Sequence, residues 1–341
     1  MRRRPYILLC ALGLLLGTFT VPPAQPSHAA DNGRWAVFPA KPEDGDKQED
    51  GDKQGEKKDG RSEKKAAIRT NFRVQADPGG TLRDKVTVSN RSRETMTFVL
   101  YAADAYNTPR DGGFAVRSRN EKQKDVGSWT RLEKREITLP ARGEKTVAFT
   151  LRVPDDAEPG DHVGAVLAVD KRVAKAKGKV GVGVQQAVGT RIYLQVNGER
   201  SPGLSIENVR FAYDSPWVPG TGEDATVTYT LVNSGNTMLE PQVDLKAKGI
   251  LGRTSLSSTG KLLPAELLPG QRVLVTHKWP GPPMLDWGEI EVTASDKDGQ
   301  LVESGSTSFR SVSWGLLLIP VVLLAGFAGW LLHRRRQRAA P

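Results

Sequence analysis

One predicted loop concentrates the side chains that could recognise a polar ligand. It spans residues 104–112, with the sequence DAYNTPRDG, and begins at Asp104. Tyr106 could stack on the face of a sugar, while Asn107 and Asp111 could hydrogen bond its hydroxyl groups. The same turn-forming composition is as typical of a structured hairpin loop, so both interpretations stay open. We treat the four side chains as candidate contacts for a glycan or a protein partner.

A second candidate is the cationic stretch KRVAKAKGKV at residues 171–180. Its five cations include Lys175, Lys177 and Lys179, and no acid interrupts them. Such a cluster could contact an anionic wall polymer or lipid headgroups. A solvated loop tip between two strands has the same composition, and it is the favoured interpretation because exposed lysines are the rule on protein surfaces.

Catalytic and metal-binding side chains are scarce in the rest of the chain. The single cysteine, Cys10, lies in an N-terminal apolar run, and the only histidines between residues 31 and 311 are His162 and His277. Nucleophilic hydrolysis needs a nucleophile with a base, and a zinc site needs three or four ligands. We expect His162, which follows Pro-Gly-Asp, to pack at a strand corner, and His277 to face outward or lie on an edge strand.

Carboxylates offer a weak case for glycoside hydrolysis. Acids occur at residues 104–111 and again at 155–161, but nothing in their spacing places two of them around an open cleft at the separation that glycosidases need. Acids in loops usually stabilise turns or face solvent. The sequence therefore predicts no enzyme activity, no catalytic residue, no cofactor and no metal site.

Both ends of the chain carry membrane-targeting patterns. Three arginines precede the apolar run Ile7–Leu16, and small residues near Ala30 suit cleavage, so residues 1–30 are predicted to be a signal peptide, with a signal anchor as the alternative. The uncharged stretch Trp314–Leu332 would reach about 28 Å as a helix, close to the thickness of a bilayer core. We predict a transmembrane helix at residues 312–333.

A basic tail at residues 334–341 sets the expected orientation. Positive charge marks the cytoplasmic side of a membrane helix, and here it comes from Arg334, Arg335, Arg336 and Arg338. The sequence thus predicts a single-pass type I protein of the plasma membrane, with an extracellular domain that faces the cell wall. Seven of the 49 basic residues are arginines of the two flanking segments, which leaves 42 against 39 acids outside and argues against nucleic-acid binding.

Short alternating segments with turn residues between them predict an all-β fold of two tandem immunoglobulin-like β-sandwich domains. The first domain covers residues 31–198, with a disordered charged insertion at 41–65 that has no aliphatic or aromatic side chain. The second covers residues 199–311. Expected strands in the first domain are 33–38, 69–76, 84–90, 96–104, 114–117, 136–139, 145–153, 162–169 and 185–196, and in the second 204–213, 225–233, 240–247, 272–279, 289–294 and 306–312. The segments ending in Asn90 and Asn233 repeat one pattern, which favours a shared architecture.

Five spaced segments of the first domain carry a family resemblance. They are FRV at 72–74 with Pro78-Gly79, DKVTVSN at 84–90, YAADA at 101–105, VGSW at 126–129 and VPDDAEPGDHVG at 153–164. Together they resemble the peptidoglycan-binding domain of the WxL-interacting protein family of Gram-positive and actinobacterial surface proteins. The resemblance implies a first domain that binds peptidoglycan and a second that engages another surface protein.

We therefore expect a non-catalytic, membrane-anchored cell-surface protein that binds peptidoglycan, a surface protein partner, or both. The alternative is a structural or assembly subunit of an envelope complex that does not bind glycan. A cell-wall enzyme is a minor alternative.

Overall fold

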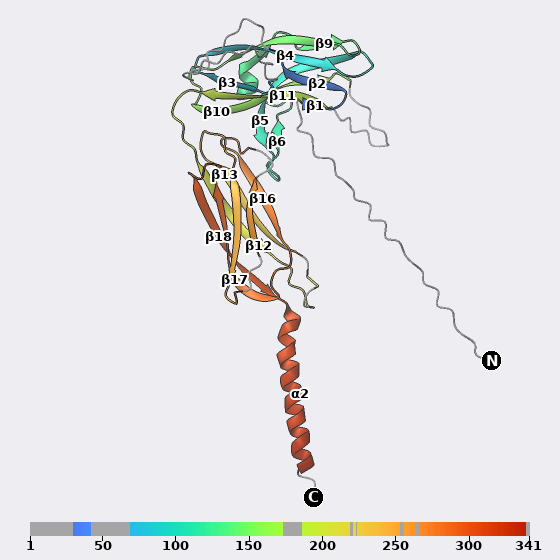
Figure 1. Cartoon of the computed structure of the whole chain (residues 1–341), viewed down its shortest axis with the longest axis vertical. Coiled ribbons are helices and arrows are strands. Elements are labelled where there is room, and N and C mark those ends of the chain that lie inside the picture. The colour runs from blue at the N-terminus through green and yellow to red at the C-terminus, as the bar shows by residue number, and fades with distance from the viewer. Residues whose placement is uncertain are drawn as a thin grey trace, which may run out of the picture.

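A computed structural model describes residues 30–41, 69–172, 186–218, 221–222, 224–252, 256–262 and 266–338. Residues 1–29 of the predicted signal peptide, nearly all of the predicted insertion and the three candidate lysines Lys175, Lys177 and Lys179 lie outside the described residues. Two β-sandwiches and one helix follow each other along the long axis (Figure 1). The all-β prediction, with two sandwich domains and a C-terminal apolar helix, is confirmed.

The first sandwich consists of two facing sheets. One has the order β1-β2-β4-β9-β7, with β1 at Ala30–Asp31, β2 at Trp35–Pro39, β4 at Thr81–Asn90, β9 at Glu144–Arg152 and β7 at Thr130–Leu132. The other has the order β3-β11-β10-β5-β6, with β3 at Phe72–Ala76, β11 at Ala187–Val196, β10 at Gly160–Asp170, β5 at Met96–Asn107 and β6 at Phe114–Val116, and β8 at Glu136–Leu139 also pairs with β5. Only the β3–β11 pair among these is parallel.

Aromatic side chains fill the space between these two sheets. Trp35 is fully buried, packs against Phe98 with 5.6 Å between ring centres, and donates its indole N–H to the carbonyl of Ala168 at 3.2 Å. Phe72 and Phe149 meet edge to face at 5.0 Å. Because one aromatic of each pair comes from each sheet, these contacts hold the two layers together.

A segment between β6 and β7 packs against β5 and β10 and contributes Val126 to the core between the two sheets. It includes the short helix α1 (Val126–Trp129), which packs on both strands. Asp104 at the end of β5 holds this segment: its carboxylate accepts the backbone N–H groups of Lys124 at 2.6 Å and Gly127 at 2.7 Å, and of Asp125. Strand β10 is buried on both faces along most of its length: Val166 and Ala168 face the core between the sheets, and Ala165 and Leu167 pack in a small apolar cluster on the opposite face.

The second sandwich has a three-stranded and a four-stranded sheet. The first has the order β12-β13-β16, at Leu204–Ala212, Ala225–Asn233 and Arg272–Trp279. The second has the order β15-β14-β17-β18, at Ser257–Leu262, Gln242–Gly249, Leu285–Ser295 and Val302–Val312. Every second residue of β13 is buried, and Trp279 meets Phe309 at 5.2 Å and Phe211 at 6.0 Å in the core.

The repeated sequence pattern corresponds to a repeated structural element. Asn90 ends β4 and Asn233 ends β13, and both are buried. Each side-chain amide donates to the carbonyl four residues on, that of Glu94 or Thr237, and each side-chain oxygen accepts the N–H two residues on. The two sandwiches thus build the same turn after equivalent strands, as the repeat predicted.

The helix α2 (Trp314–Arg338) follows β18 after one residue, Ser313. Its part from Trp314 to Arg335 is long and apolar enough to span a membrane, and the protein covers none of its most apolar stretch. The guanidinium of Arg334 lies 5.2 Å from the ring centre of Trp330. The helix begins two residues after the start of the predicted span 312–333, because Val312 still pairs within the sheet, and it continues through the arginine run to Arg338.

Candidate functional site

The two sandwiches meet in a polar and partly buried junction. The ends of β5 and β6 extend from the first sandwich toward the second (Figure 1). A small apolar cluster forms beneath them, in which Val163 and Tyr193 of the first sandwich pack with Leu268 of the second. Asn107, which the sequence proposed as a ligand contact, lies in this junction, where it binds the second sandwich instead.

Asn107 is the central hydrogen-bonding residue of this junction. Its side chain is 3% exposed. The amide nitrogen donates to the carbonyl of Glu266 at 2.8 Å and to that of Gly112 at 3.1 Å, and the amide oxygen accepts the N–H of Leu268 at 2.8 Å. The predicted role of Asn107 as a ligand for sugar hydroxyls is therefore wrong in this structure, because the second sandwich occupies its donors and its acceptor.

A second pair of contacts lies at the start of β10. The backbone N–H of Asp161 donates to the carbonyl of Asn236 at 2.8 Å, and the Asp161 carboxylate accepts the N–H of Met238 at 2.8 Å. The Asn236 amide in turn donates to the carbonyls of Pro159 at 3.0 Å and Glu199 at 2.8 Å. Gly160, which lies between Pro159 and Asp161 in the chain, has a φ of +125° and leaves no room for a side chain against Asn236.

Tyr193 links a third set of polar groups across the junction. Its hydroxyl donates to the Glu266 carboxylate at 2.9 Å and accepts from Arg191 at 3.0 Å, and Arg191 also pairs with Glu266 at 3.7 Å. Burial raises the pKa of the Tyr193 hydroxyl above its ordinary value, an effect that Arg191 opposes and Glu266 reinforces. The hydroxyl therefore stays protonated and available as a donor.

The other predicted contacts do not form one site with Asn107. Asp104 is 5% exposed and directs its carboxylate to the α1 segment, so it too is unavailable to a ligand. Tyr106 is partly buried, with the guanidinium of Arg117 at 5.9 Å from its ring centre. Asp111 is exposed, but it accepts from the Thr108 hydroxyl and from a backbone N–H, which lower the pKa of its carboxyl. This geometry is that of a structured hairpin loop, the other of the two interpretations.

That loop also touches the second sandwich directly. The carbonyl of Pro109 accepts the N–H of Leu274 at 2.8 Å, and Gly112 lies against Val273. Leu274 and Val273 belong to β16, whose outer edge has no strand partner in its sheet among the described residues. The loop that the sequence proposed as a ligand site therefore packs against the edge strand β16 of the second sandwich.

An open groove of about 530 Å³ runs beside the junction. Its walls are mostly polar and include Arg73, Gln75, Asp161, His162 and Tyr193, with the Arg73 guanidinium 4.8 Å from the Tyr193 ring centre. Such a surface offers hydrogen-bond donors and acceptors to a polar ligand. Among the described residues, no three His, Cys, Asp or Glu side chains come together as a metal site.

His162 packs at a corner, as the sequence predicted. Its two ring nitrogens lie 2.8 Å from the carboxylate of Asp125 and 2.8 Å from the carbonyl of Glu158, and its ring lies 5.0 Å from that of Trp129. Burial disfavours the charged imidazole, but the hydrogen bond and charge of Asp125, with help from Glu158, outweigh it and raise the pKa of His162. His277 lies on the edge strand β16, also as predicted.

Sequence reasoning missed Asn236, Glu266 and Tyr193 as residues of the junction. Asn236 lies just after the predicted strand 225–233, in the sequence Asn-Ser-Gly-Asn, and Tyr193 lies inside the predicted strand 185–196. The equivalence of Asn90 and Asn233 was the one available signal, because it aligns the two domains and so marks the turn after β13 as a defined structure. Nothing in the linear pattern placed that turn against the start of β10.

Comparison with known proteins gives a fold likeness and no family. No family model matches the chain, and no curated protein does. Among solved structures, the class 5 fimbrial chaperone CfaA matches with 12% identity over 71% of this chain and 96% of its own, at a TM-score of 0.34. The E. coli chaperone DraB matches with 13% identity over 70% of this chain and 95% of its own, at a TM-score of 0.29. The Pseudomonas aeruginosa CupB2 chaperone matches with 9% identity over 71% of this chain and 97% of its own, also at a TM-score of 0.29. At these values the likeness carries no conclusion about function.

Proposed function

We propose that this protein is a non-catalytic, membrane-anchored assembly subunit that holds a surface protein partner at a set distance from the membrane. The observation that carries the proposal is the buried hydrogen-bonded junction between the two sandwiches. Binding of peptidoglycan, which the family resemblance implies, stays a second prediction.

The junction supports a rigid spacer because its polar groups are paired across the two domains. Asn107 and Asn236 each bond the backbone of both sandwiches, and separating the domains would leave those groups without partners or return them to water. Two domains joined only by a flexible linker would not form such buried hydrogen bonds with each other. The two sandwiches therefore act as one body.

The link to the helix supports the same conclusion. Ser313 is the only residue between β18 and α2, and its backbone N–H donates to the carbonyl of Met284 at 2.7 Å. The orientation of the second sandwich is thus coupled to that of the helix. With Arg334 and its neighbours on the cytoplasmic side, both sandwiches lie outside the cell, and the first is held farthest from the membrane.

The positions of two predicted glycan contacts favour the assembly role over the wall-binding role. The side chains of Asp104 and Asn107 are both engaged in hydrogen bonds within the protein. The observation that keeps wall binding open is the polar groove at Arg73, which is accessible and could take a sugar. The two roles make different demands on the cell wall and can be separated experimentally.

A pull-down from solubilised envelopes tests the assembly role. The full chain, with an affinity tag after residue 341, should retain a defined membrane or surface protein both before and after digestion of the wall with a muramidase. A matched control fuses α2 to an unrelated soluble domain, and it should retain nothing. Recovery of no specific protein with the full chain would refute the proposal.

A sedimentation assay tests the wall-binding role. The purified chain in detergent is mixed with isolated sacculi at low salt, and Arg73→Ala is compared with Arg272→Ala, an exposed arginine of the second sandwich. Sedimentation that Arg73→Ala alone abolishes would establish wall binding in the groove. A chain that stays in the supernatant would remove peptidoglycan from its ligands.

A further inference from the structure

Exposed apolar side chains collect at one end of the second sandwich, the end from which α2 leaves. Outside α2, eight large apolar side chains of the described residues are exposed, and none of them belongs to the first sandwich. Six lie near the start of α2: Trp217, Val218, Ile250, Leu251, Met284 and Trp287. A cluster of this kind marks an interaction surface, because soluble surfaces carry such residues singly. We call these six residues the base of the second sandwich.

Hydrogen bonds fix the base to the beginning of the helix. The carbonyl of Trp217 accepts the N–H of Gly315 at 2.9 Å, and that of Met284 accepts the N–H of Ser313. The carbonyl of Trp287 accepts the N–H of Ile250 at 3.0 Å. Three separate loops are thus held at the level where the helix begins.

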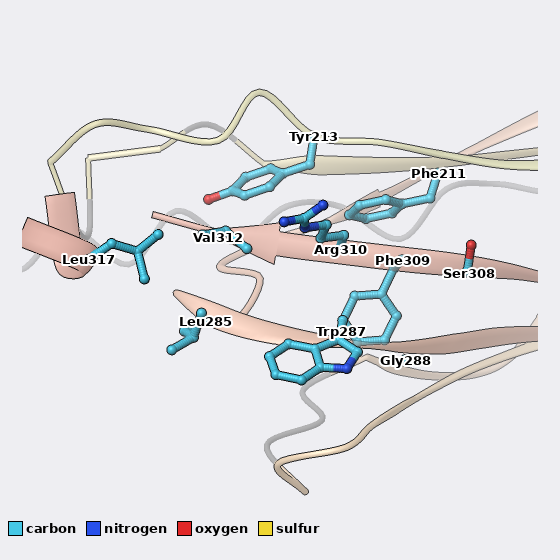
Figure 2. A pocket seen from close by; sticks show the side chains of 10 residues that line it. All are labelled: Phe211, Tyr213, Leu285, Trp287, Gly288, Ser308, Phe309, Arg310, Val312 and Leu317. Carbon is cyan, nitrogen blue, oxygen red and sulfur yellow. The ribbon is translucent and has the colours of Figure 1, made fainter. Parts of the chain in front are cut away.

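A groove of about 840 Å³ opens beside the base and shares Trp287 with it (Figure 2). It lies where the end of β12 meets the start of β17 and the end of β18, and one of its walls is Leu317, in the second turn of α2. Tyr213, Trp287 and Val312 supply further apolar or amphipathic wall. Its volume is within the range of small-molecule binding sites.

One cation projects into this groove. Figure 2 shows the guanidinium of Arg310 on the side toward the rings of Phe211 and Tyr213. Arg310 is exposed and makes no ion pair with any residue that the structure describes. It pairs across the strands with Trp287, so cation and indole lie on the same face of the sheet. A guanidinium binds phosphate oxygens in a planar, two-point geometry, and an arginine without an acidic partner keeps that capacity.

We propose that the base lies in the headgroup layer of the membrane that α2 enters and that the groove binds the phosphate of an anionic phospholipid through Arg310. This inference rests on the membrane anchoring that is part of the proposed function. The lipid is the occupant that the geometry favours, because Leu317 makes the groove continuous with the membrane helix. Tryptophan and tyrosine, which have an apolar body and a polar edge, are the side chains that favour this layer.

Lipid titration of the full chain in detergent, followed by native mass spectrometry, tests the headgroup site. The probes are phosphatidylglycerol and the zwitterionic phosphatidylcholine. Wild type should retain phosphatidylglycerol, and Arg310→Gln should bind it about tenfold more weakly or worse, because a hydrogen bond to a charged group is lost. Arg272→Gln, an exposed arginine on β16 paired with Glu207, is the matched control and should bind as wild type does. Binding by Arg310→Gln within twofold of wild type would overturn the inference.

Depth measurements in vesicles test the position of the base. In a Cys10→Ser chain, a fluorophore is attached to Ile250→Cys or, as the control, to Val302→Cys, which starts β18 ten residues before its membrane end. Nitroxide lipids should quench the first label and leave the second unquenched, since ten strand residues span about 33 Å. A chain that floats with the vesicles but shows no quenching at position 250 overturns this inference alone. A chain that does not float with the vesicles overturns the membrane anchoring and, with it, the proposed function.

Discussion

Replacement of Asn107 by alanine tests whether the junction joins the two sandwiches into one body. The substitution removes an amide that makes two hydrogen bonds of 2.8 Å to the second sandwich and one of 3.1 Å within its own hairpin. It leaves the N–H of the buried Leu268 without an acceptor, and such an orphaned group costs about 1 to 3 kcal/mol. The carbonyl of the half-buried Glu266 can recover a bond to water, so we expect a total loss of about 2 to 4 kcal/mol in the free energy of unfolding.

Denaturant titration and calorimetry of the detergent-solubilised chain measure this loss. Wild type should unfold both sandwiches in one transition, and Asn107→Ala should split that transition in two because the domains no longer stabilise each other. The control is Asn71→Ala, whose amide makes a single 3.5 Å contact with its neighbour Thr70 and whose removal should cost less than about 0.5 kcal/mol. If the two variants lose the same stability and both keep one transition, the junction does not couple the domains and the spacer argument fails.

Three further substitutions probe the corner, its histidine and the second core. Gly160→Ala should open the junction to proteolysis, because its φ of +125° and the opposing backbone exclude a side chain, whereas Gly33→Ala, at φ +78° in open space, should not. Wild type should lose stability relative to His162→Gln as the pH rises from about 6.5. Because the pKa of His162 is raised in the folded state, the stabilisation of the charged imidazole by Asp125 is complete below that pH and is lost above the folded-state pKa. A difference in unfolding free energy between the two proteins that stays constant from pH 5 to pH 9 would contradict this. Trp279→Ala should cost about 3 to 5 kcal/mol in denaturant titration, and a loss below 1 kcal/mol would mean that the second core closes without it.

The sequence was a good guide to the strands and a poor guide to the contacts between them. Strand β13 could be predicted to the residue because every second side chain faces the core. Strand β7 was missed because three residues are too few to show a period, and β15, SSTGKL, because it has one large apolar side chain. The helix α1 was missed for the same reason, since four residues give about one turn.

The candidate loop failed for a physical reason of another kind. Asn107 and Glu266 are 159 positions apart, and the sequence contains no signal for a contact at that distance. A polar loop residue that binds a sugar and one that binds another domain have the same local composition. Asp111 was correctly placed in a hairpin loop, whereas Tyr106 lies in β5, which continues past the predicted end at residue 104 to Asn107 and pairs with β6. Only the packing of the second sandwich decides what that loop contacts.

The single residue between β18 and α2 has a mechanical consequence. A pull on the first sandwich enters the second at the start of β12 and leaves through the end of β18, parallel to the strands. Strand β18 pairs with β17 over eleven positions, so the load acts along that whole ladder in shear. Bonds loaded in this direction share the force, whereas bonds opened from one end break one after another. With no slack at Ser313, tension between the outer partner and the membrane reaches α2 without first unravelling a linker.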